Sequence, residues 1–253
     1  MSLGVAFVRV GEYTRGMDDH KNARFREADF SGARFHGVNF SNVKISDAWL
    51  FNVEISGLVG GLAVNGVDVS AYVEAELNKR HPERLLLAPF DPDGMRSAWK
   101  SIEDFSAVTL DRARALPADK LDESVDEEWS FLQTIRHLVF ATDRWITGPV
   151  LGDANPFHPL GMPNPPHDEV DAGAFDLDGT PTFDEVLAVR LERMHRVAEH
   201  IGGIDADELT RQVQSPNGGT TTVMSCLHLV LREEWWHDQY ANRDLAILER
   251  GSR

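Results

Sequence analysis

A carboxylate and an imidazole stand four residues apart near the end of the chain, in the segment LREEWWHDQY of residues 231–240. On a helix, Glu233 and His237 would lie about 40° apart around the axis and about 6 Å apart along it. Such a pair can form an ion pair at a helix edge or supply two ligands of a metal ion. Taken alone, the pair is more typical of a solvated or ion-paired edge, so the surrounding pattern has to decide.

An apolar stripe on this helix favours the metal interpretation. At 100° per residue one stripe holds Cys226, Leu229, Val230, Glu233, His237, Tyr240 and Asp244. Its apolar half should face the core, and a carboxylate that continues it is costly unless a cation or an imidazole meets it. We therefore predict that Glu233 binds a metal ion and that Glu234, 100° further round, does not. Trp235 and Trp236 would pack around the pair.

A third candidate ligand, His137, lies in the middle of WSFLQTIRHLVFATDRWI, residues 129–146, which is apolar nearly all round. A helix of this kind is enclosed by neighbouring elements. One turn away stand Gln133, Thr134 and Ala141, and these small or polar residues suggest a cavity wall. A single buried histidine is usually a hydrogen-bonded core residue. Combined with a core-facing Glu/His pair, however, it is typical of metal sites inside helical bundles.

The other reactive side chains are weaker candidates. His228 falls on the opposite side of its helix from His237 and is expected in the core or at an interface. Cys226 is expected to pack in the core. His158, in a loop, and His195 and His200, away from the main apolar stripe of their helix, are expected to have ordinary loop or surface roles.

Four long helices are predicted to position the three candidate ligands. The first opens at Asp91-Pro92 and ends before Pro117, the second covers 127–146, the third starts at the capping box Thr182-x-x-Glu185, and the fourth covers 222–249. A Pro/Gly/Asp-rich stretch, 149–181, is expected to be a long loop that covers one end of the assembly. This order predicts a four-helix bundle.

The front of the chain carries a repeat of five residues. From Asn22 to Ser56 it reads NARFR EADFS GARFH GVNFS NVKIS DAWLF NVEIS, with a large apolar residue at the centre of each unit and a small one two residues earlier. Neither a helix nor a plain strand has this period, whereas a solenoid with five-residue sides does. We expect both apolar positions to point into the column.

Between the repeat and the helices, the sequence predicts a small hairpin around Asn65-Gly66, a short helix over 69–79 and a linker. The predicted organisation is a repeat segment over 1–60, the hairpin, short helix and linker over 61–90, and the helical domain over 91–253. The fold class is mainly α: a four-helix bundle preceded by a short β segment.

Composition bounds the partners. The formal net charge of −16 disfavours nucleic acid and anionic membranes as partners. One cysteine excludes a disulfide within the chain, and neither a secretory signal nor a membrane-length apolar run is evident. We expect a cytoplasmic protein that acts on a small-molecule substrate, with a homodimer allowed.

The five-residue repeat resembles the pentapeptide-repeat family, whose motif is A(D/N)LXX and whose fold is a right-handed quadrilateral β-helix; EADFS and GVNFS match it best. Four pentapeptides make one coil in that family, so this segment is under two coils. Some members mimic DNA with an acidic rod. Here the bases Lys21, Arg24, Arg26, Arg34 and Lys44 outnumber the acids Glu27, Asp29, Asp47 and Glu54 by one, so an accessory or capping role is expected instead.

Residues 90–250 resemble the DinB-like superfamily through EEWSFLQTIRHLVFATDRWI and CLHLVLREEWWHDQYANRDLAIL. This superfamily includes YfiT-type metal hydrolases, bacillithiol S-transferases and mycothiol-dependent maleylpyruvate isomerases. Its four-helix bundle holds a metal ion by one ligand from the second helix and two at i, i+4 on the last. Many members have His-x-x-x-His there. Glu233 departs from that pattern, but a His, Glu, His set, here His137, Glu233 and His237, is the arrangement of the mycothiol-dependent branch.

Three protein ligands leave coordination positions open, which is the pattern of catalytic metal sites. Zinc or nickel is expected first, and iron or manganese also suits two imidazoles and a carboxylate. The ion could activate water for hydrolysis or bind a thiol as thiolate. The resemblance implies the second, a transferase or isomerase with mycothiol or bacillithiol as co-substrate. Glu234, Tyr240 and Asp244 are candidate supporting or substrate-binding groups.

A non-catalytic protein is the alternative. In that case the repeat segment would mediate binding or assembly, and the metal ion would be structural or vestigial.

Overall fold

The computed structural model describes residues 20–35, 37–57, 59–164 and 172–251. The chain divides into two compact units, one made of residues 1–58 and 164–170 and the other of 59–163 and 171–253. We call the described residues 20–57 the repeat unit and the described residues 59–163 and 172–251 the helical unit. The predicted mainly α fold is confirmed, and few residues form strands.

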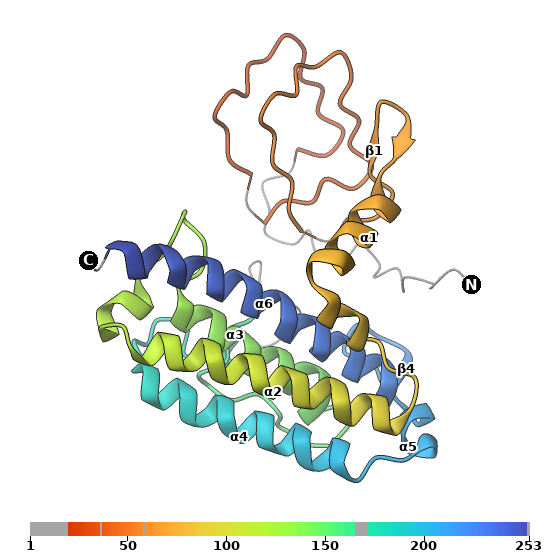
Figure 1. Ribbon diagram of the computed structural model, residues 1–253, viewed down its shortest axis with the longest axis vertical. Helices are drawn as coiled ribbons and strands as arrows, with labels where there is room; N and C mark the ends of the chain where they lie inside the picture. The colour runs from red at the N-terminus through yellow and green to blue at the C-terminus, as the bar shows by residue number, and fades with distance from the viewer. Residues whose placement is uncertain (1–19, 36, 58, 165–171, 252–253) are drawn as a thin grey trace. The chain divides into compact units, whose positions relative to one another are not determined.

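The repeat unit winds in square-cornered coils (Figure 1). Its backbone has a positive φ at every fifth residue, at Asn22, Glu27, Gly32, Gly37, Asn42, Asp47, Asn52 and Gly57. Glycine, asparagine and aspartate tolerate this conformation best, which explains the first position of the repeat. At alternate corners a backbone bond closes a tight turn, as in Ala33 N to Phe30 O at 3.0 Å.

The central residues of the repeat face one another, as expected of a column. Ring centroids are 5.4 Å apart for Phe25 and Phe30, 6.1 Å for Phe30 and Phe35, and 5.3 Å for Phe35 and Phe40. These side chains nevertheless remain about half exposed or more; Phe25 is 64% exposed. The repeat unit has too few coils to cover the ends of its own stack.

The helical unit begins with the predicted hairpin and short helix. Strands β1 (Ala63–Val64) and β2 (Val67–Asp68) pair antiparallel. Asn65 and Gly66 between them both have positive φ, as a two-residue type I′ turn requires. Helix α1 (Ser70–Arg80) and a 3₁₀ turn (Pro82–Leu86) follow.

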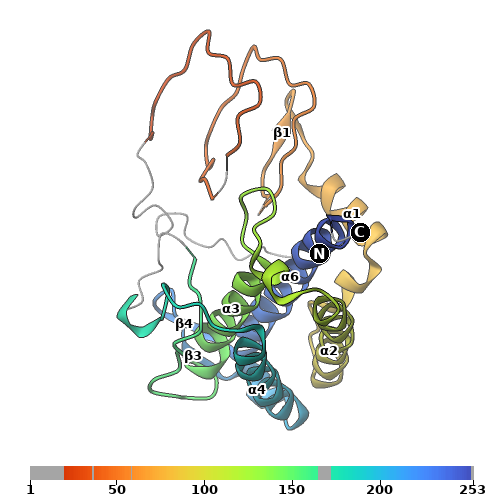
Figure 2. The same ribbon diagram turned by 90° about the vertical axis from the view of Figure 1, so that its left-hand side faces the viewer.

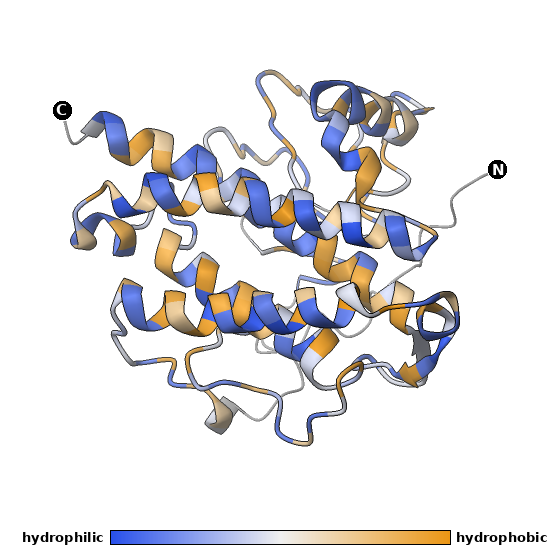
Figure 3. Ribbon diagram, turned by 60° about the horizontal axis from the view of Figure 1, so that its bottom comes forward, coloured by the Kyte–Doolittle hydropathy of each residue, from blue (hydrophilic) through white to orange (hydrophobic). Residues whose placement is uncertain are grey.

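Four long helices make up the rest of this unit. They are α2 (Pro92–Arg114), α3 (Phe131–Thr142), α4 (Phe183–Gly202) and α6 (Val223–Gly251). They lie side by side, with both α6 and α4 packing on α2 and on α3 (Figures 1 and 2). Apolar and polar residues alternate along each helix (Figure 3), which buries one face of each. Helix α3 is the exception, because all its residues except Gln133 are buried, as predicted.

Helix α3 begins at 131, four residues after the predicted start. Asp126 and Glu127 have positive φ and cannot be helical. Instead, Ser130 caps the helix in a reciprocal capping box with Gln133. The helix then widens into a π-helical turn at Asp143–Thr147. The capping box of Thr182 and Glu185 at the start of α4 is present, as predicted.

Short elements between the long helices were not predicted, because a few residues carry too little periodicity. They are the 3₁₀ turns Ala118–Asp122 and Ala172–Ala174, helix α5 (Ala206–Thr210), and strands β3 (Gln212–Gln214) and β4 (Thr220–Thr222), which pair across the turn SPNGG. Part of the predicted long loop, 165–171, lies outside the described residues.

None of the helices in the described ranges is both long enough and apolar enough to cross a bilayer.

Candidate metal centre

The His137 ring is fixed from behind by a backbone carbonyl. Its side chain is 3% exposed, and its Nδ1 lies 2.9 Å from the carbonyl oxygen of Met162, in the loop that follows the π-helical turn. A carbonyl only accepts hydrogen bonds, so Nδ1 is protonated in this contact, and Nε2 is the nitrogen left on the side of Glu233. This is the arrangement in which a histidine binds metal through Nε2.

Helix α6 brings Glu233 and His237 to the same place. Nδ1 of His237 donates to the backbone carbonyl of Glu233 at 2.8 Å, which leaves its Nε2 available in the same way. Glu233 Oε2 lies 3.7 Å from His137 Nε2, and the two imidazole rings lie 4.7 Å apart. Ligand atoms of the three side chains all fall within 4.8 Å of one another. The structure thus brings together the three residues that the sequence singled out.

The geometry and donor set fit a divalent transition-metal ion. Metal–nitrogen and metal–oxygen bonds near 2.1 Å place tetrahedral ligand atoms roughly 3.4 Å apart, so small side-chain rotations would close the observed spacing around an ion. Two imidazoles and one carboxylate suit zinc, nickel, iron or manganese.

The electrostatics of the group also suit a cation. Burial raises the pKa of Glu233, but interactions with His137, His237 and Arg232 outweigh it, and the pKa lies below its ordinary value. Burial and the neighbouring His137 lower the pKa of His237 to about 4, against the pull of Glu233. The carboxylate is therefore charged and His237 neutral at pH 7, which are the forms that bind metal ions.

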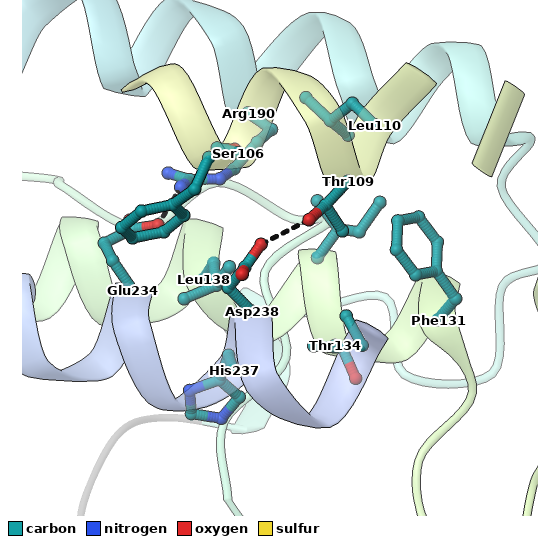
Figure 4. A pocket seen from close by; sticks show the side chains of 13 residues that line it. Ser106, Thr109, Leu110, Phe131, Thr134, Leu138, Arg190, Glu234, His237 and Asp238 are labelled. Atoms are coloured by element: carbon teal, nitrogen blue, oxygen red, sulfur yellow. Dashed lines mark hydrogen bonds and ion pairs between the residues drawn. The ribbon is translucent and has the colours of Figure 1, made fainter. Parts of the chain in front are cut away.

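Glu234 has a different environment from Glu233. Its side chain is 2% exposed, whereas that of Glu233 is 36% exposed, and it forms a buried ion pair with Arg190 of α4. In Figure 4 the His237 ring projects from α6 on the side away from Arg190 and Asp238. The group that could hold an ion includes Glu233 and not Glu234. Glu234 is more buried than its place on the helical wheel predicts, because its partner Arg190 lies on another helix.

A small cavity lies behind this ion pair, between α2, α3, α4 and α6. Its volume is about 30 Å³, and its lining includes Thr109, Thr134, Arg190, Glu234 and His237 (Figure 4). That is room for about two water molecules, far too little for an organic substrate. His137, which was expected to line a cavity, is not among its lining residues.

Aromatic side chains flank the two candidate histidine ligands. The ring of Trp129 lies 4.9 Å from that of His137, and the ring of Tyr240 lies 6.0 Å edge-on from that of His237. Tyr240 also stacks on Trp236. Asp244, the remaining candidate supporting group, accepts a hydrogen bond from Arg243 at 2.7 Å. Trp235, buried in the core, donates to Glu83.

Two residues that contact His137, Met162 and Trp129, were not predicted from the sequence. A backbone carbonyl leaves no mark in the residue type, so nothing in the sequence pointed to Met162. Trp129 stands directly before the helix cap Ser130, and recognising that capping box would have placed it beside the first turn of α3.

The other histidines lie outside the group. Nε2 of His228 lies 2.7 Å from the carbonyl oxygen of Pro89 at an interface between segments. His195 is exposed and pairs with Glu199, while His200 is mostly buried beside Glu208. His158 lies in the loop, where its Nδ1 accepts a bond from Leu160 N. Cys226 is fully buried, as expected.

In comparison with known proteins, the repeat unit and the helical unit match two different families. Residues 21–57, which make up nearly all of the repeat unit, match the pentapeptide repeats in eight copies. No curated protein and no solved structure matches the chain significantly. Residues 101–241, which span α2 to α6 and contain all three candidate ligands, match the DinB superfamily; since this is more than half of the chain, the protein belongs to the DinB superfamily.

Proposed function

We propose that this protein is a divalent-metal-dependent enzyme that uses a low-molecular-weight thiol in a transfer or isomerisation reaction, with His137, Glu233 and His237 as the metal ligands. The observation that carries the proposal is the meeting of these three side chains, with both imidazoles held by backbone carbonyls so that Nε2 is free. A bound divalent ion would supply Lewis acidity that lowers the pKa of a thiol or a water molecule beside it.

The number of protein ligands supports an enzymatic role. Structural zinc sites are closed by four protein ligands, whereas catalytic sites have three and keep a position open. Here three residues converge, and the 36% exposure of the Glu233 side chain gives solvent access to the group. Trp129 and Tyr240, both half-buried, offer apolar walls beside the ligands for the rest of a substrate.

The preference for a thiol over water rests on the ligand set. In the mycothiol-dependent branch that this sequence resembles, the last helix supplies glutamate and histidine, as Glu233 and His237 do here. Mycothiol and bacillithiol are therefore the first co-substrates to test, and hydrolysis is the competing reaction.

Cobalt substitution separates these two chemistries. We expect mycothiol or bacillithiol, added to the Co²⁺-substituted protein, to produce a sulfur-to-cobalt charge-transfer band, and the S-methylated form of the same thiol to produce none. The His137→Ala variant should give no band, because it lacks one ligand. Cobalt binding without any thiol band would remove the thiol step and leave hydrolysis as the function to test.

One observation favours a second, non-catalytic role for the repeat unit. Trp49 and Phe51 are 92% and 82% exposed, at positions where the other repeats carry mainly charged or small polar residues. An exposed aromatic pair of this kind suits protein interaction. Pull-down with purified Trp49→Ser/Phe51→Ser protein against wild type tests whether the repeat unit assembles with a partner.

A further inference from the structure

One loop segment is fastened to α3 directly beside the candidate metal ligand. The segment is residues 157–162, which follow the π-helical turn, and we call it the strap. Arg136, one residue before His137 and 5% exposed, donates from Nε to the carbonyl oxygen of Leu160 at 3.0 Å and from Nη2 to the carbonyl oxygen of Asp176. Its guanidinium thus links the strap to Asp176, which follows residues 165–171, the stretch outside the described residues.

The strap also provides the carbonyl group that holds His137. Met162 donates its N–H to the carbonyl of Arg136 at 3.1 Å, and its own carbonyl accepts from His137 Nδ1 at 2.9 Å. Arg136 therefore holds the strap at Leu160, and His137 is held by the strap two residues later. Moving the strap would move the acceptor that fixes the imidazole.

The strap is closely packed around Gly161. A Cβ atom on Gly161 would lie 3.1 Å from the carbonyl oxygen of His158, 3.3 Å from the Phe175 ring and 3.5 Å from Phe140 Cα. Phe157 also stacks on Phe140 at 5.7 Å. Only glycine allows this approach without displacing a neighbour.

Burial of a charged arginine costs free energy. Arg136 offsets this cost by donating hydrogen bonds to main-chain carbonyl groups. Transfer of a charged group from water is repaid only if its donors are satisfied. A guanidinium presents several donors in a rigid fork, so it can hold two carbonyl groups in fixed positions, which an ammonium group does less well.

We propose that Arg136 is a positioning residue for the metal centre: by holding the strap it sets the Met162 carbonyl, which keeps His137 in the Nδ1-protonated tautomer with Nε2 free for the ion. The proposal rests on the proposed function for the role of His137 as a ligand. The effect of Arg136 on the tautomer, however, can be measured without any metal ion.

The direct test is histidine-selective ¹⁵N NMR of the metal-free protein at pH 8. The His137 signal, assigned by its loss in His137→Gln, should show a single Nδ1-protonated tautomer in wild type. Arg136→Met should show a mixture of tautomers, and Arg136→Lys should restore the wild-type signal in part, because its ammonium can still reach a carbonyl.

Arg96 provides a matched control. Arg96 lies on α2, and its Nη1 donates to the carbonyl oxygens of Ile201 and Ile204, at the C-terminal end of α4. It too joins a helix to main-chain carbonyl groups, but not to those of the strap. Arg96→Met should lower stability while leaving the His137 tautomer unchanged. If Arg136→Met gave the wild-type tautomer, Arg136 would be no more than a structural residue like Arg96.

Metal affinity gives the second readout. Disturbing the partner of a metal-bound histidine typically weakens binding 10- to 100-fold, and we expect a loss in this range for Arg136→Met, measured by Zn²⁺ titration. Should Arg136→Met fail to fold, Gly161→Ala displaces the same strap by its Cβ, and unchanged tautomer and affinity in that variant would overturn the proposal. A wild-type protein that binds no metal would refute the proposed function, while the tautomer comparison would still decide whether Arg136 sets the ring.

Discussion

At the residue scale, two adjacent carboxylates on α6 have different environments. Glu233 lies in the group that could hold an ion and is partly exposed, whereas Glu234 is buried against Arg190. The sequence could single out Glu233, because the four-residue spacing to His237 is local. It could not reveal the partner of Glu234, because Arg190 lies 44 residues away on another helix.

Matched glutamine variants should separate these roles. Glu233→Gln is expected to weaken Zn²⁺ binding more than about 100-fold, since loss of a ligand costs more than loss of a supporting contact, with little change in the free energy of unfolding. Glu234→Gln should nearly retain metal affinity but lose about 3–5 kcal/mol of stability, because the buried Arg190 charge loses its counter-ion. Zinc titration and urea unfolding of both proteins provide the comparison, and a reversed pattern would contradict the site assignment.

Cys226 is predicted to be inert at neutral pH. Burial raises the pKa of its thiol to about 11, from an ordinary value of 9.0. The unfolded chain therefore loses this proton first, so stability should be constant below about pH 9 and fall by roughly 2–3 kcal/mol as the pH rises towards 11. Urea unfolding at pH 8 and pH 11, compared with Cys226→Ala, isolates this contribution. An equal loss in both proteins would rule it out.

At the scale of elements, the long helices could be predicted and their local irregularities could not. The apolar period and the capping box of Thr182 and Glu185 located α4 correctly. The start of α3 was wrong by four residues, although Ser130 and Gln133 carry the same capping signal. The π-helical turn at Asp143–Thr147 has no residue pattern of its own, and the strap depends on contacts between distant residues.

The two capping boxes offer a test of how helix ends affect the site. Ser130→Ala should destabilise the protein by about 1 kcal/mol, through loss of the α3 cap. Metal affinity should be nearly unchanged, because His137 lies about two turns into the helix. Thr182→Ala removes the matching cap of α4 and should cost a similar amount. A large loss of metal affinity in Ser130→Ala alone would show that the cap, and not the strap, positions His137.

At the scale of the whole molecule, the repeat could be recognised from its period, and its first position could have shown where the chain turns. Asn, Gly and Asp recur there because the corner residues adopt positive φ. The role of the repeat unit does not follow from its period. Both buried core clusters consist of residues from Leu87 onward, so the helical unit has its own hydrophobic core.

The helical unit is therefore expected to fold without the repeat unit. A protein comprising residues 59–253 should unfold cooperatively, with a melting temperature close to that of the full chain, and should bind metal with similar affinity. Calorimetry and zinc titration of both proteins check this. Aggregation or loss of metal binding in the shorter protein would instead show that the helical unit depends on the repeats.

The metal content of the purified protein tests the proposed metal centre most directly. If His137, Glu233 and His237 form the centre, wild type should carry about one divalent ion per chain, and His137→Ala should carry almost none. His195→Ala, which removes an exposed histidine from α4, should retain the wild-type content. Equal metal content in wild type and His137→Ala, measured by elemental analysis after the same purification, would contradict the metal centre itself.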